Sequence, residues 1–195
     1  MARTRSKNYD DVRDQILTTA AKVFATKGAH AATIIDIGEA CKASKSRLYH
    51  YFPSKEAVLF EVLKRHVEFL VEKAREVVSK EQPADLKLID FIDVHLQYYR
   101  ENEYAQSVIW PGSSLLPPKE LKVIKALERE LLRLLSSLLA ELRPRSKPSQ
   151  PAVVDALLVY GMLNWTLTWY QAQGPVNRQQ LARRIADICL RGVVA

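Results

Sequence analysis

The hydrophobic residues of this 195-residue chain recur mostly at intervals of three and four positions. This spacing places them on one face of an α-helix, whereas a half-buried strand requires strict alternation of apolar and polar residues, which no segment shows. We therefore predict an all-α fold of about nine helices and no strands. The clearest helices are predicted at residues 10–27, 34–41, 45–51, 55–80, 84–101, 121–142, 151–173 and 177–192.

Local signals mark the ends of the short helices near the N-terminus. Thr33 precedes an apolar helical run and has Asp36 three residues later, a pattern close to a capping box. Ser44 and Ser54 stand where they can cap the two following helices. Pro53 ends the helix before it, because a proline pushes the preceding residue out of the helical region. These signals predict two short helices followed by a long one.

Two stretches rich in proline and small residues interrupt the helical pattern. The first, WPGSSLLPP at residues 110–118, is predicted to be a turn-rich region that separates two helical parts of the chain. The second, RPRSKPSQP at residues 143–151, is predicted to be a polar loop. No apolar run reaches the roughly 18 residues that a bilayer span needs, and the N-terminus lacks the apolar core of a secretory signal. We expect a cytoplasmic protein with no membrane partner.

Positive charge is concentrated at the N-terminal end of the chain. Residues 1–55 contain ten Lys and Arg but five Asp and Glu, whereas the remaining residues contain nineteen and seventeen. A basic segment on a nearly neutral body is the electrostatic footprint of an anionic partner such as a nucleic acid. Charge alone fits a solvated face equally well, so the assignment needs a motif.

The same basic segment has the dimensions of a helix-turn-helix. In that motif the second helix, here residues 45–51, enters the major groove of DNA. Arg47 is the best candidate for a base contact, because its guanidinium can pair with O6 and N7 of guanine. Leu48 and Phe52 are expected to anchor the helix to the core, although a plain surface helix is the competing interpretation. The residues predicted to contact DNA are Thr33, Ser44, Lys45, Ser46, Arg47, Tyr49, His50, Tyr51 and Lys55.

The segment TIIDIGEACKASKSRLYHYFPSKEAVL resembles the DNA-binding signature of the TetR family of one-component repressors. The positions that match the family pattern are Thr33, Ile37, Ala40, Ser44, Leu48, Tyr49, Tyr51, Phe52, Lys55, Glu56 and Leu59. Lys42 departs from it, because the family usually has glycine in this turn; a left-handed lysine costs about 1 kcal/mol. Ser46 and Arg47 replace the residues that are commoner there, and Arg47 suggests an individual operator preference.

The resemblance implies an N-terminal three-helix DNA-binding domain at residues 10–70, with the helix-turn-helix at residues 33–52. A linking helix that starts near Ser54 would join it to an effector-binding and dimerisation domain at residues 71–195. The family dimerises through its two C-terminal helices. Two recognition helices about 34 Å apart, one from each subunit, would recognise a longer operator than one helix does. Packing within the chain is the alternative for these apolar faces. The residues predicted at a homodimer interface are Val153, Leu157, Tyr160, Gly161, Asn164, Leu181, Ile185 and Ile188.

The middle helices mix aromatic and polar residues, as the lining of a ligand cavity does. The candidates for effector binding are His66, Phe69, His95, Tyr98, Trp110 and Trp165, and ordinary core packing is the alternative for each. His66 is preferred, because it lies on the apolar face of the linking helix. The C-terminal segments LNWTLTWYQAQGP and LARRIADICLRGV are similar to a branch of the family that regulates degradation of fatty acids, aromatic acids or steroids. That branch often responds to coenzyme A thioesters, so we expect an acyl-CoA or a hydrophobic catabolite as the effector.

Two other classes of protein compete with a ligand-responsive regulator. An enzyme is disfavoured, because the sequence contains no HExxH, GxSxG, P-loop or GxGxxG motif and its two cysteines lie far apart. We accordingly expect no catalytic residue, no metal and no cofactor. An architectural DNA-binding protein or a protein-interaction bundle would need no effector, and its DNA affinity would depend on salt but hardly on sequence. The predicted function is that of a homodimeric repressor that a small molecule releases from double-stranded operator DNA.

Overall fold

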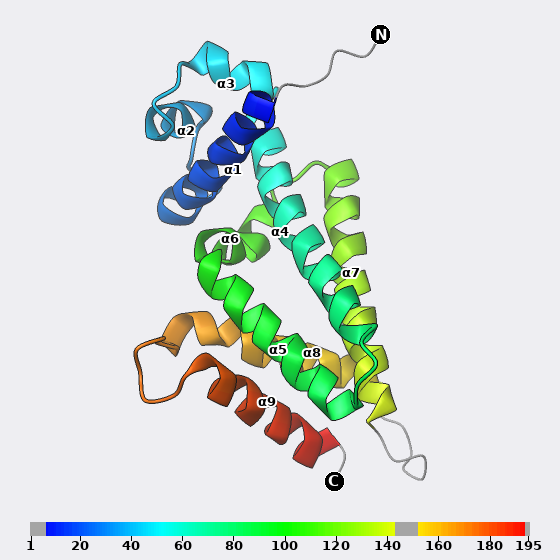
Figure 1. Cartoon of the computed structure of the whole chain (residues 1–195). Helices are drawn as coiled ribbons and strands as arrows, with labels where there is room; N and C mark the ends of the chain where they lie inside the picture. The colour runs from blue at the N-terminus through cyan, green and yellow to red at the C-terminus, as the bar shows by residue number, and fades with distance from the viewer. Residues whose placement is uncertain (1–6, 143–151, 194–195) are drawn as a thin grey trace. The chain divides into compact units, whose positions relative to one another are not determined.

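The computed structural model describes residues 7–142 and 152–193, and these ranges contain nine α-helices and no strand (Figure 1). The helices are α1 (Lys7–Lys27), α2 (Ile34–Ala40), α3 (Lys45–Tyr51), α4 (Lys55–Val78), α5 (Ala84–Glu101), α6 (Glu103–Ser113), α7 (Pro118–Glu141), α8 (Ala152–Trp169) and α9 (Arg178–Val193). The all-α prediction is confirmed, while the loop predicted at residues 143–151 lies outside the described residues. Crossing a bilayer would need a longer apolar helix than any in the described ranges.

The helices form two compact units. The first unit consists of Met1–Val67 and Tyr104–Lys125, and the second of Glu68–Glu103 and Ala126–Ala195. Helices α4 and α7 contribute residues to both units, and nearly all of α6 belongs to the first. The boundary predicted between residues 70 and 71 lies close to the end of the first segment at Val67. The predicted domains place α6 in the C-terminal domain, whereas α6 lies almost entirely in the first unit. The two predicted domains stay a prediction.

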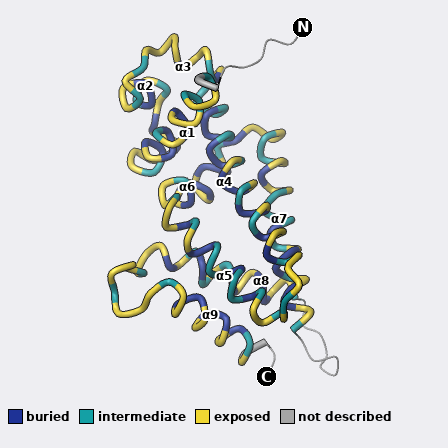
Figure 2. The backbone as a smooth tube through the Cα atoms, in the orientation of Figure 1, coloured by how far each residue is buried: buried dark blue, intermediate teal, exposed yellow. Residues whose placement is uncertain are grey.

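The core of the first unit is supplied by one apolar face from each of its first four helices. Phe24 of α1, Ile37 of α2 and Leu59 of α4 are almost completely buried (Figure 2). Leu48 and Phe52 are buried too, which confirms that they anchor α3 from below. Burying a side chain of this size contributes about 1.5–3 kcal/mol, so α3 is held by contacts with its neighbours rather than by its own backbone.

Polar caps fix where the short helices begin. The capping box at α2 is complete, because Thr33 and Asp36 satisfy each other's backbone N–H groups. The Ser44 hydroxyl accepts a hydrogen bond from the backbone N–H of Arg47 at 3.2 Å. At the start of α4, the Ser54 hydroxyl accepts one from the backbone N–H of Ala57 at 3.1 Å. The three predicted caps are confirmed, and each is typically worth about 1 kcal/mol.

A left-handed residue makes the tight turn between α2 and α3. Lys42 has a φ of 51°, in the region that the resemblance implied for this position. Immediately after it, the backbone N–H of Ala43 bonds to the carbonyl oxygen of Gly38 at 2.9 Å, which closes the turn over the end of α2. A Cβ in this conformation meets the following carbonyl oxygen and costs roughly 1–2 kcal/mol, so the turn is made at the expense of stability.

The turn-rich interpretation of residues 110–118 is wrong in its first part, because α6 continues through Pro111 to its end at Ser113. A Cβ built on Gly112 would lie 3.1 Å from Cδ1 of Leu59, so α6 approaches α4 very closely at this point. This packing outweighs the local turn preference of Trp-Pro-Gly-Ser. Pro111 supplies no N–H for the bond to the carbonyl four residues earlier, and α6 ends two residues after it, at Ser113.

The second unit is organised around α5, which contacts both α8 and α9. Leu88, Phe91 and Ile92 on the inner face of α5 are fully buried. At the start of α9, the Arg178 guanidinium lies 3.3 Å from Oδ2 of Asp93 and donates to Oε1 of Gln97 at 2.5 Å. These contacts from one arginine to two residues of α5 fix the start of the last helix.

Helix α8 ends earlier than the predicted residue 173. Its last helical residue is Trp169, and the N–H of Tyr170 still bonds to the carbonyl oxygen of Thr166 at 2.8 Å. The chain then turns, and the N–H of Gly174 bonds to the carbonyl oxygen of Gln171 at 2.9 Å. The glycine and proline that follow the helix favour this turn over further helix.

Replacing Lys42 with glycine is expected to raise the free energy of unfolding by about 0.5–1 kcal/mol, because glycine adopts a left-handed φ without a steric cost. Chemical denaturation followed by circular dichroism measures the change. Lys42→Ala is the matched control, since it removes the same charge but keeps a Cβ. An equal gain in both variants would trace the effect to the lost charge and would contradict the backbone explanation.

Candidate nucleic-acid interface

Helix α3 presents its first turn to solvent. Ser44 caps the helix, and the three residues that follow it, Lys45, Ser46 and Arg47, are all exposed, whereas Leu48 faces the core. In Figure 2 most of the tube of α3 has the colour of exposed residues. In a helix-turn-helix the N-terminal residues of the second helix meet the base edges. The residues predicted to read DNA therefore lie on a surface that a major groove can receive.

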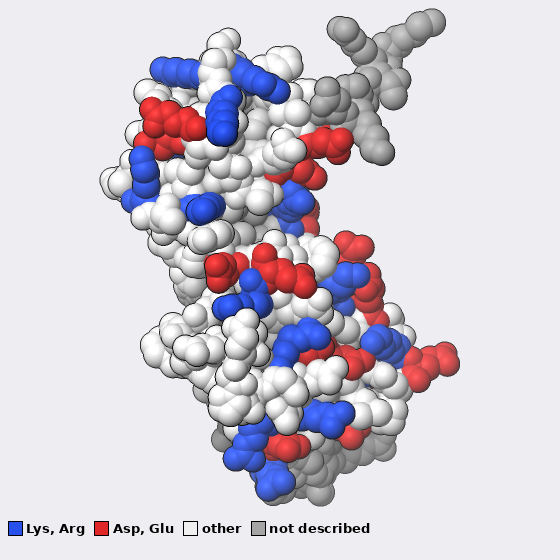
Figure 3. All heavy atoms as spheres, turned by 60° about the vertical axis from the view of Figure 1, so that its left-hand side comes forward, with Lys and Arg blue, Asp and Glu red and all other residues white. Residues whose placement is uncertain are grey.

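Positive charge accompanies the exposed turn. Figure 3 shows Lys and Arg side chains gathered on the end of the molecule that carries α2 and α3, with a few acidic side chains beside them. Among the described residues, no carboxylate forms an ion pair with Lys42, Lys45 or Arg47. Nζ of Lys45 lies 5.8 Å from the ring centroid of Tyr49, within the range of a cation–π contact. These charges are available to an anionic partner.

Asp36 holds the start of α2 in place. Its Oδ1 accepts a hydrogen bond from Nζ of Lys27 at 2.5 Å, and its Oδ2 accepts from the N–H and the hydroxyl of Thr33, each at 2.8 Å. The Lys27 ammonium and these hydrogen bonds lower the pKa of Asp36 to about 2. The capping contribution is therefore complete above the ordinary carboxyl pKa of about 3.9 and is lost as the pH falls through 2. The Thr33 hydroxyl, predicted to contact DNA, is engaged in this cap.

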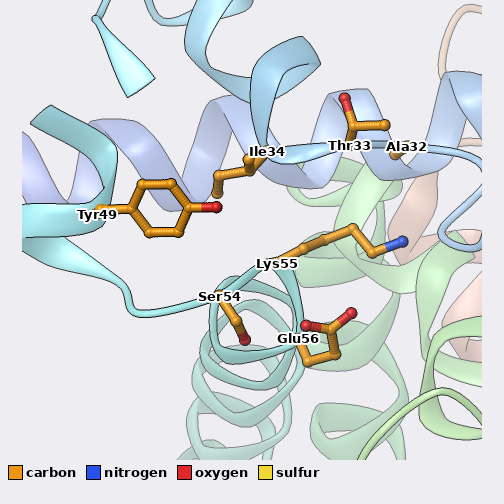
Figure 4. A pocket seen from close by; sticks show the side chains of 7 residues that line it. All are labelled: Ala32, Thr33, Ile34, Tyr49, Ser54, Lys55 and Glu56. Carbon is orange, nitrogen blue, oxygen red and sulfur yellow. The ribbon is translucent and has the colours of Figure 1, made fainter. Parts of the chain in front are cut away.

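A hollow of about 300 Å³ opens beside the helix-turn-helix. Figure 4 shows Tyr49 of α3 on one side of it, the start of α2 above it and the first residues of α4 below. Two of the residues predicted to contact the DNA backbone, Thr33 and Lys55, lie beside this hollow. The acidic side chain of Glu56 lines it as well. The lining residues of the hollow are Ala32, Thr33, Ile34, Tyr49, Ser54, Lys55 and Glu56.

Lys55 lines this hollow but its ammonium group is directed at the protein backbone. Nζ donates hydrogen bonds to the carbonyl oxygens of Ala29 at 3.2 Å and His30 at 3.0 Å. It thereby ties the start of α4 to the segment between α1 and α2. No local sequence pattern predicts this contact, because the partners are backbone atoms about 25 positions away. A contact between Lys55 and a DNA phosphate stays a prediction.

The three aromatic residues predicted to contact DNA have different environments. Tyr49 and His50 are exposed, whereas Tyr51 is half-buried. The Tyr51 ring packs against Tyr9 of α1 with 4.6 Å between ring centroids, and His50 meets Tyr51 edge-on at 5.3 Å. Tyr49 and His50 can reach a nucleic acid, while Tyr51 helps to seat the helix. Tyr9 was missed from the sequence, since it precedes the periodic apolar stripe of α1.

Two of the predicted effector-binding residues belong to the first unit. His66 is buried, and its Nε2 lies 2.6 Å from Oε1 of Gln106. Burial lowers the pKa of His66 to about 4, so the ring is neutral at pH 7. Trp110 is 73% exposed in the described chain. Gln106 was missed from the sequence, because its partner is 40 positions away and no local pattern links the two residues.

The other four predicted effector-binding residues belong to the second unit. Phe69 and Tyr98 stack with 4.1 Å between ring centroids. Nδ1 of the buried His95 donates to the carbonyl oxygen of Phe91 at 2.8 Å. Trp165 of α8 is 67% exposed. Core packing and a ligand site both fit the three inner residues, so the assignment stays a prediction. Among the described residues, no group of three or more His, Cys, Asp or Glu could hold a metal ion.

The residues predicted at a dimer interface divide between surface and core. On α8, Val153, Leu157 and Gly161 are exposed, and Tyr160 and Asn164 are half-buried; on α9, Ile188 is exposed. Leu181 and Ile185 are buried within the single chain, because the inner face of α9 packs inside the second unit, so they offer little surface to a partner. Helix α8 exposes more apolar side chains than predicted, namely Val153, Val154, Leu157, Leu158, Trp165, Leu167 and Trp169.

Comparison with protein families matches both parts of the chain to one family. The model described as "Tetracyclin repressor-like, C-terminal domain" matches residues 80–193. The model described as "Bacterial regulatory proteins, tetR family" matches residues 16–62, which include the helix-turn-helix. A curated relative, the HTH-type transcriptional repressor KstR2 of Mycolicibacterium smegmatis, is 26% identical over 187 residues, which cover 93% of this chain and 90% of the relative.

Solved structures with the same fold cover nearly the whole chain. A TetR-family transcriptional regulator from Bordetella parapertussis 12822 is 38% identical with a TM-score of 0.87, covering 93% of this chain and 95% of that one. AibR, solved in complex with isovaleryl coenzyme A and operator DNA, has a TM-score of 0.79 at 20% identity, covering 91% of this chain and 97% of that one. At that identity the likeness to AibR concerns the fold alone.

Proposed function

Because the chain belongs to the TetR family of DNA-binding transcriptional regulators, we propose that it is a repressor that reads operator DNA with α3 and leaves it when a small molecule binds. Members of this family are DNA-binding regulators and not enzymes. The observation that carries the proposal is the capped and exposed first turn of α3, which is seated on the core by Leu48 and Phe52.

The exposed residues of the first unit supply two kinds of DNA contact. Arg47, near the leading end of α3, has the bidentate geometry that distinguishes guanine in the major groove. Lys45 and Lys42 carry unneutralised charges beside it and suit phosphates. We propose that Arg47 gives sequence preference and that the lysines give affinity.

Arg47→Ala is expected to lower operator affinity by about ten- to a hundredfold and to relax discrimination against altered sequences, because one bidentate base contact is worth about 1–3 kcal/mol. Fluorescence anisotropy with operator and scrambled duplexes measures both effects. Lys45→Ala is the matched control, for which we expect uniform weakening on both duplexes and a salt dependence reduced by about one phosphate. Unchanged discrimination by Arg47→Ala would rule out its base contact.

We propose that the exposed face of α8 binds a second copy of the chain. Monomeric proteins rarely expose several neighbouring apolar side chains, and such patches mark interaction sites. Figure 3 shows an uncharged area over the end of α8. A two-fold symmetric pair would present two copies of α3, so a palindromic operator with half-sites about 34 Å apart is expected. Ile188 of α9 adds to the apolar surface of this unit.

Leu157→Asp is expected to weaken the dimer by roughly tenfold or more, because it places a charge in an apolar interface. Sedimentation velocity across a dilution series measures the change. Leu86→Asp on α5 is the matched control, since Leu86 is 47% exposed and Leu157 56% exposed but Leu86 lies outside the proposed interface. A dimer that is equally stable in both variants would place the interface elsewhere.

We propose an acyl-CoA thioester as the effector class. The C-terminal segments of the chain support it through their similarity to regulators of fatty acid, aromatic acid and steroid degradation. AibR shares the fold, and its structure contains isovaleryl coenzyme A together with operator DNA, so this fold is compatible with such an effector. Within the first unit, the contact between His66 and Gln106 fastens α6 to α4. A ligand that displaces α6 would therefore also displace the helix that follows the reader.

A titration of the purified protein against DNA from upstream of its own gene, and against scrambled DNA, tests this function at two salt concentrations. We expect tight binding to the upstream DNA alone and its reversal by an acyl-CoA, with free coenzyme A as the control. Linkage requires the acyl-CoA to lower DNA affinity by the same factor by which DNA lowers acyl-CoA affinity. Equal, salt-sensitive binding to both duplexes would favour an architectural protein instead.

A further inference from the structure

Two side chains of α1 pack against the C-terminal end of α3. Tyr9 and Arg13 are four residues apart and so lie on the same face of α1. The ring of Tyr9 packs against Tyr51, the last residue of α3. The guanidinium carbon of Arg13 lies 5.0 Å from the ring centroid of Phe52, the residue that caps the helix end. The recognition helix is thus held from the side as well as from below.

Arg13 also reaches the helix that follows. Its Nη2 donates to Oε2 of Glu61 in α4 at 2.6 Å, and the two side chains are 28% and 27% exposed. A partly desolvated pair is screened by salt much less than a surface pair. One guanidinium therefore connects three helices, because it extends from α1, covers Phe52 at the end of α3 and pairs with Glu61 on α4.

A second ion pair between the same two helices differs in its surroundings. Arg65 of α4 lies 3.0 Å from Asp14 of α1, with side chains 52% and 57% exposed. Among the described residues, Arg65 has no contact with an aromatic ring of α3. Both ion pairs join α1 to α4. They differ in that Arg13 also contacts the end of the recognition helix.

We infer that Arg13 is a positioning residue for operator recognition, which fixes the direction of α3 relative to α4 by holding Phe52 and Glu61 at once. The inference rests on the proposed function of α3 as the DNA reader. Arg13 acts at the end of α3 opposite to Lys45 and Arg47, and its charge is paired with Glu61. It therefore sets the angle at which the reading residues meet the bases without contributing a phosphate contact.

The test compares operator binding by Arg13→Ala with binding by Arg65→Ala, at several salt concentrations and at a temperature where circular dichroism shows each variant folded. We expect Arg13→Ala to lose about tenfold in operator affinity, the equivalent of one partly buried charge contact, and Arg65→Ala to lose no more than about twofold. The slope of log Kd against log salt concentration should stay at the wild-type value in both variants, because neither residue neutralises a phosphate.

Two further variants separate positioning from general stability. Arg13→Lys keeps the charge but lacks the planar group that stacks on Phe52, so we expect an intermediate loss of affinity. The double variant with Arg13→Glu and Glu61→Arg restores the ion pair across the same two helices. We expect it to bind the operator more tightly than either single variant, as coupled residues do in a double-mutant cycle.

Three results would overturn the inference. Folded Arg13→Ala with wild-type operator affinity would show that the contacts of Arg13 have no effect on recognition. A salt slope reduced by one phosphate would identify Arg13 as a direct DNA contact. Losses that simply add in the double variant would show that Arg13 and Glu61 do not act together. Failure of the wild-type protein to discriminate any operator would instead overturn the proposed function, and the inference with it.

Discussion

A helix of seven residues cannot maintain itself in water, because the cost of its first turn is recovered only over a much longer helix. This constraint governs the whole first unit, since α3 has seven residues and α2 has the same number. The Ser44 hydroxyl accepts from one of the leading N–H groups, that of Arg47, and Leu48 and Phe52 attach the helix to the core. The contacts from α1 then hold its far end. A reader built this way has a rigid direction even though its own backbone contributes little stability.

A buried polar contact fixes the position of α6 on α4 within the first unit. His66 of α4 and Gln106 of α6 meet inside the core, and the histidine stays neutral near pH 7 because burial disfavours its charged form. A hydrogen bond between neutral groups is directional, so it defines how α6 sits on α4 more narrowly than apolar packing does. The close approach of Gly112 to Leu59 acts in the same direction. Helix α6 is therefore rigidly attached to α4, the helix that follows the recognition helix α3.

Features encoded by neighbouring residues were predictable from the sequence, and features encoded by distant pairs were not. The caps at Thr33, Ser44 and Ser54 depend on spacings of three residues, and the anchors of α3 depend on a spacing of four. In contrast, Arg13 and Glu61 lie 48 positions apart and leave no local pattern. The turn predicted at Pro111 is wrong, because the packing of α6 against α4 keeps this segment helical. Helix α8 is apolar on nearly every face, so its sequence did not reveal that Leu158 and Trp169 are exposed as well as the predicted Leu157.

The first unit is discontinuous in the chain, since Met1–Val67 is completed by Tyr104–Lys125. The DNA-binding unit therefore cannot be transferred to another protein as a single N-terminal segment that ends just after the helix-turn-helix. A fragment ending near Val67 would leave Leu59, Leu63 and His66 without the helix that covers them. During synthesis on the ribosome, the DNA-reading unit likewise stays incomplete until residue 125 has emerged. Transplanting the operator preference of this protein requires the transfer of α6 as well.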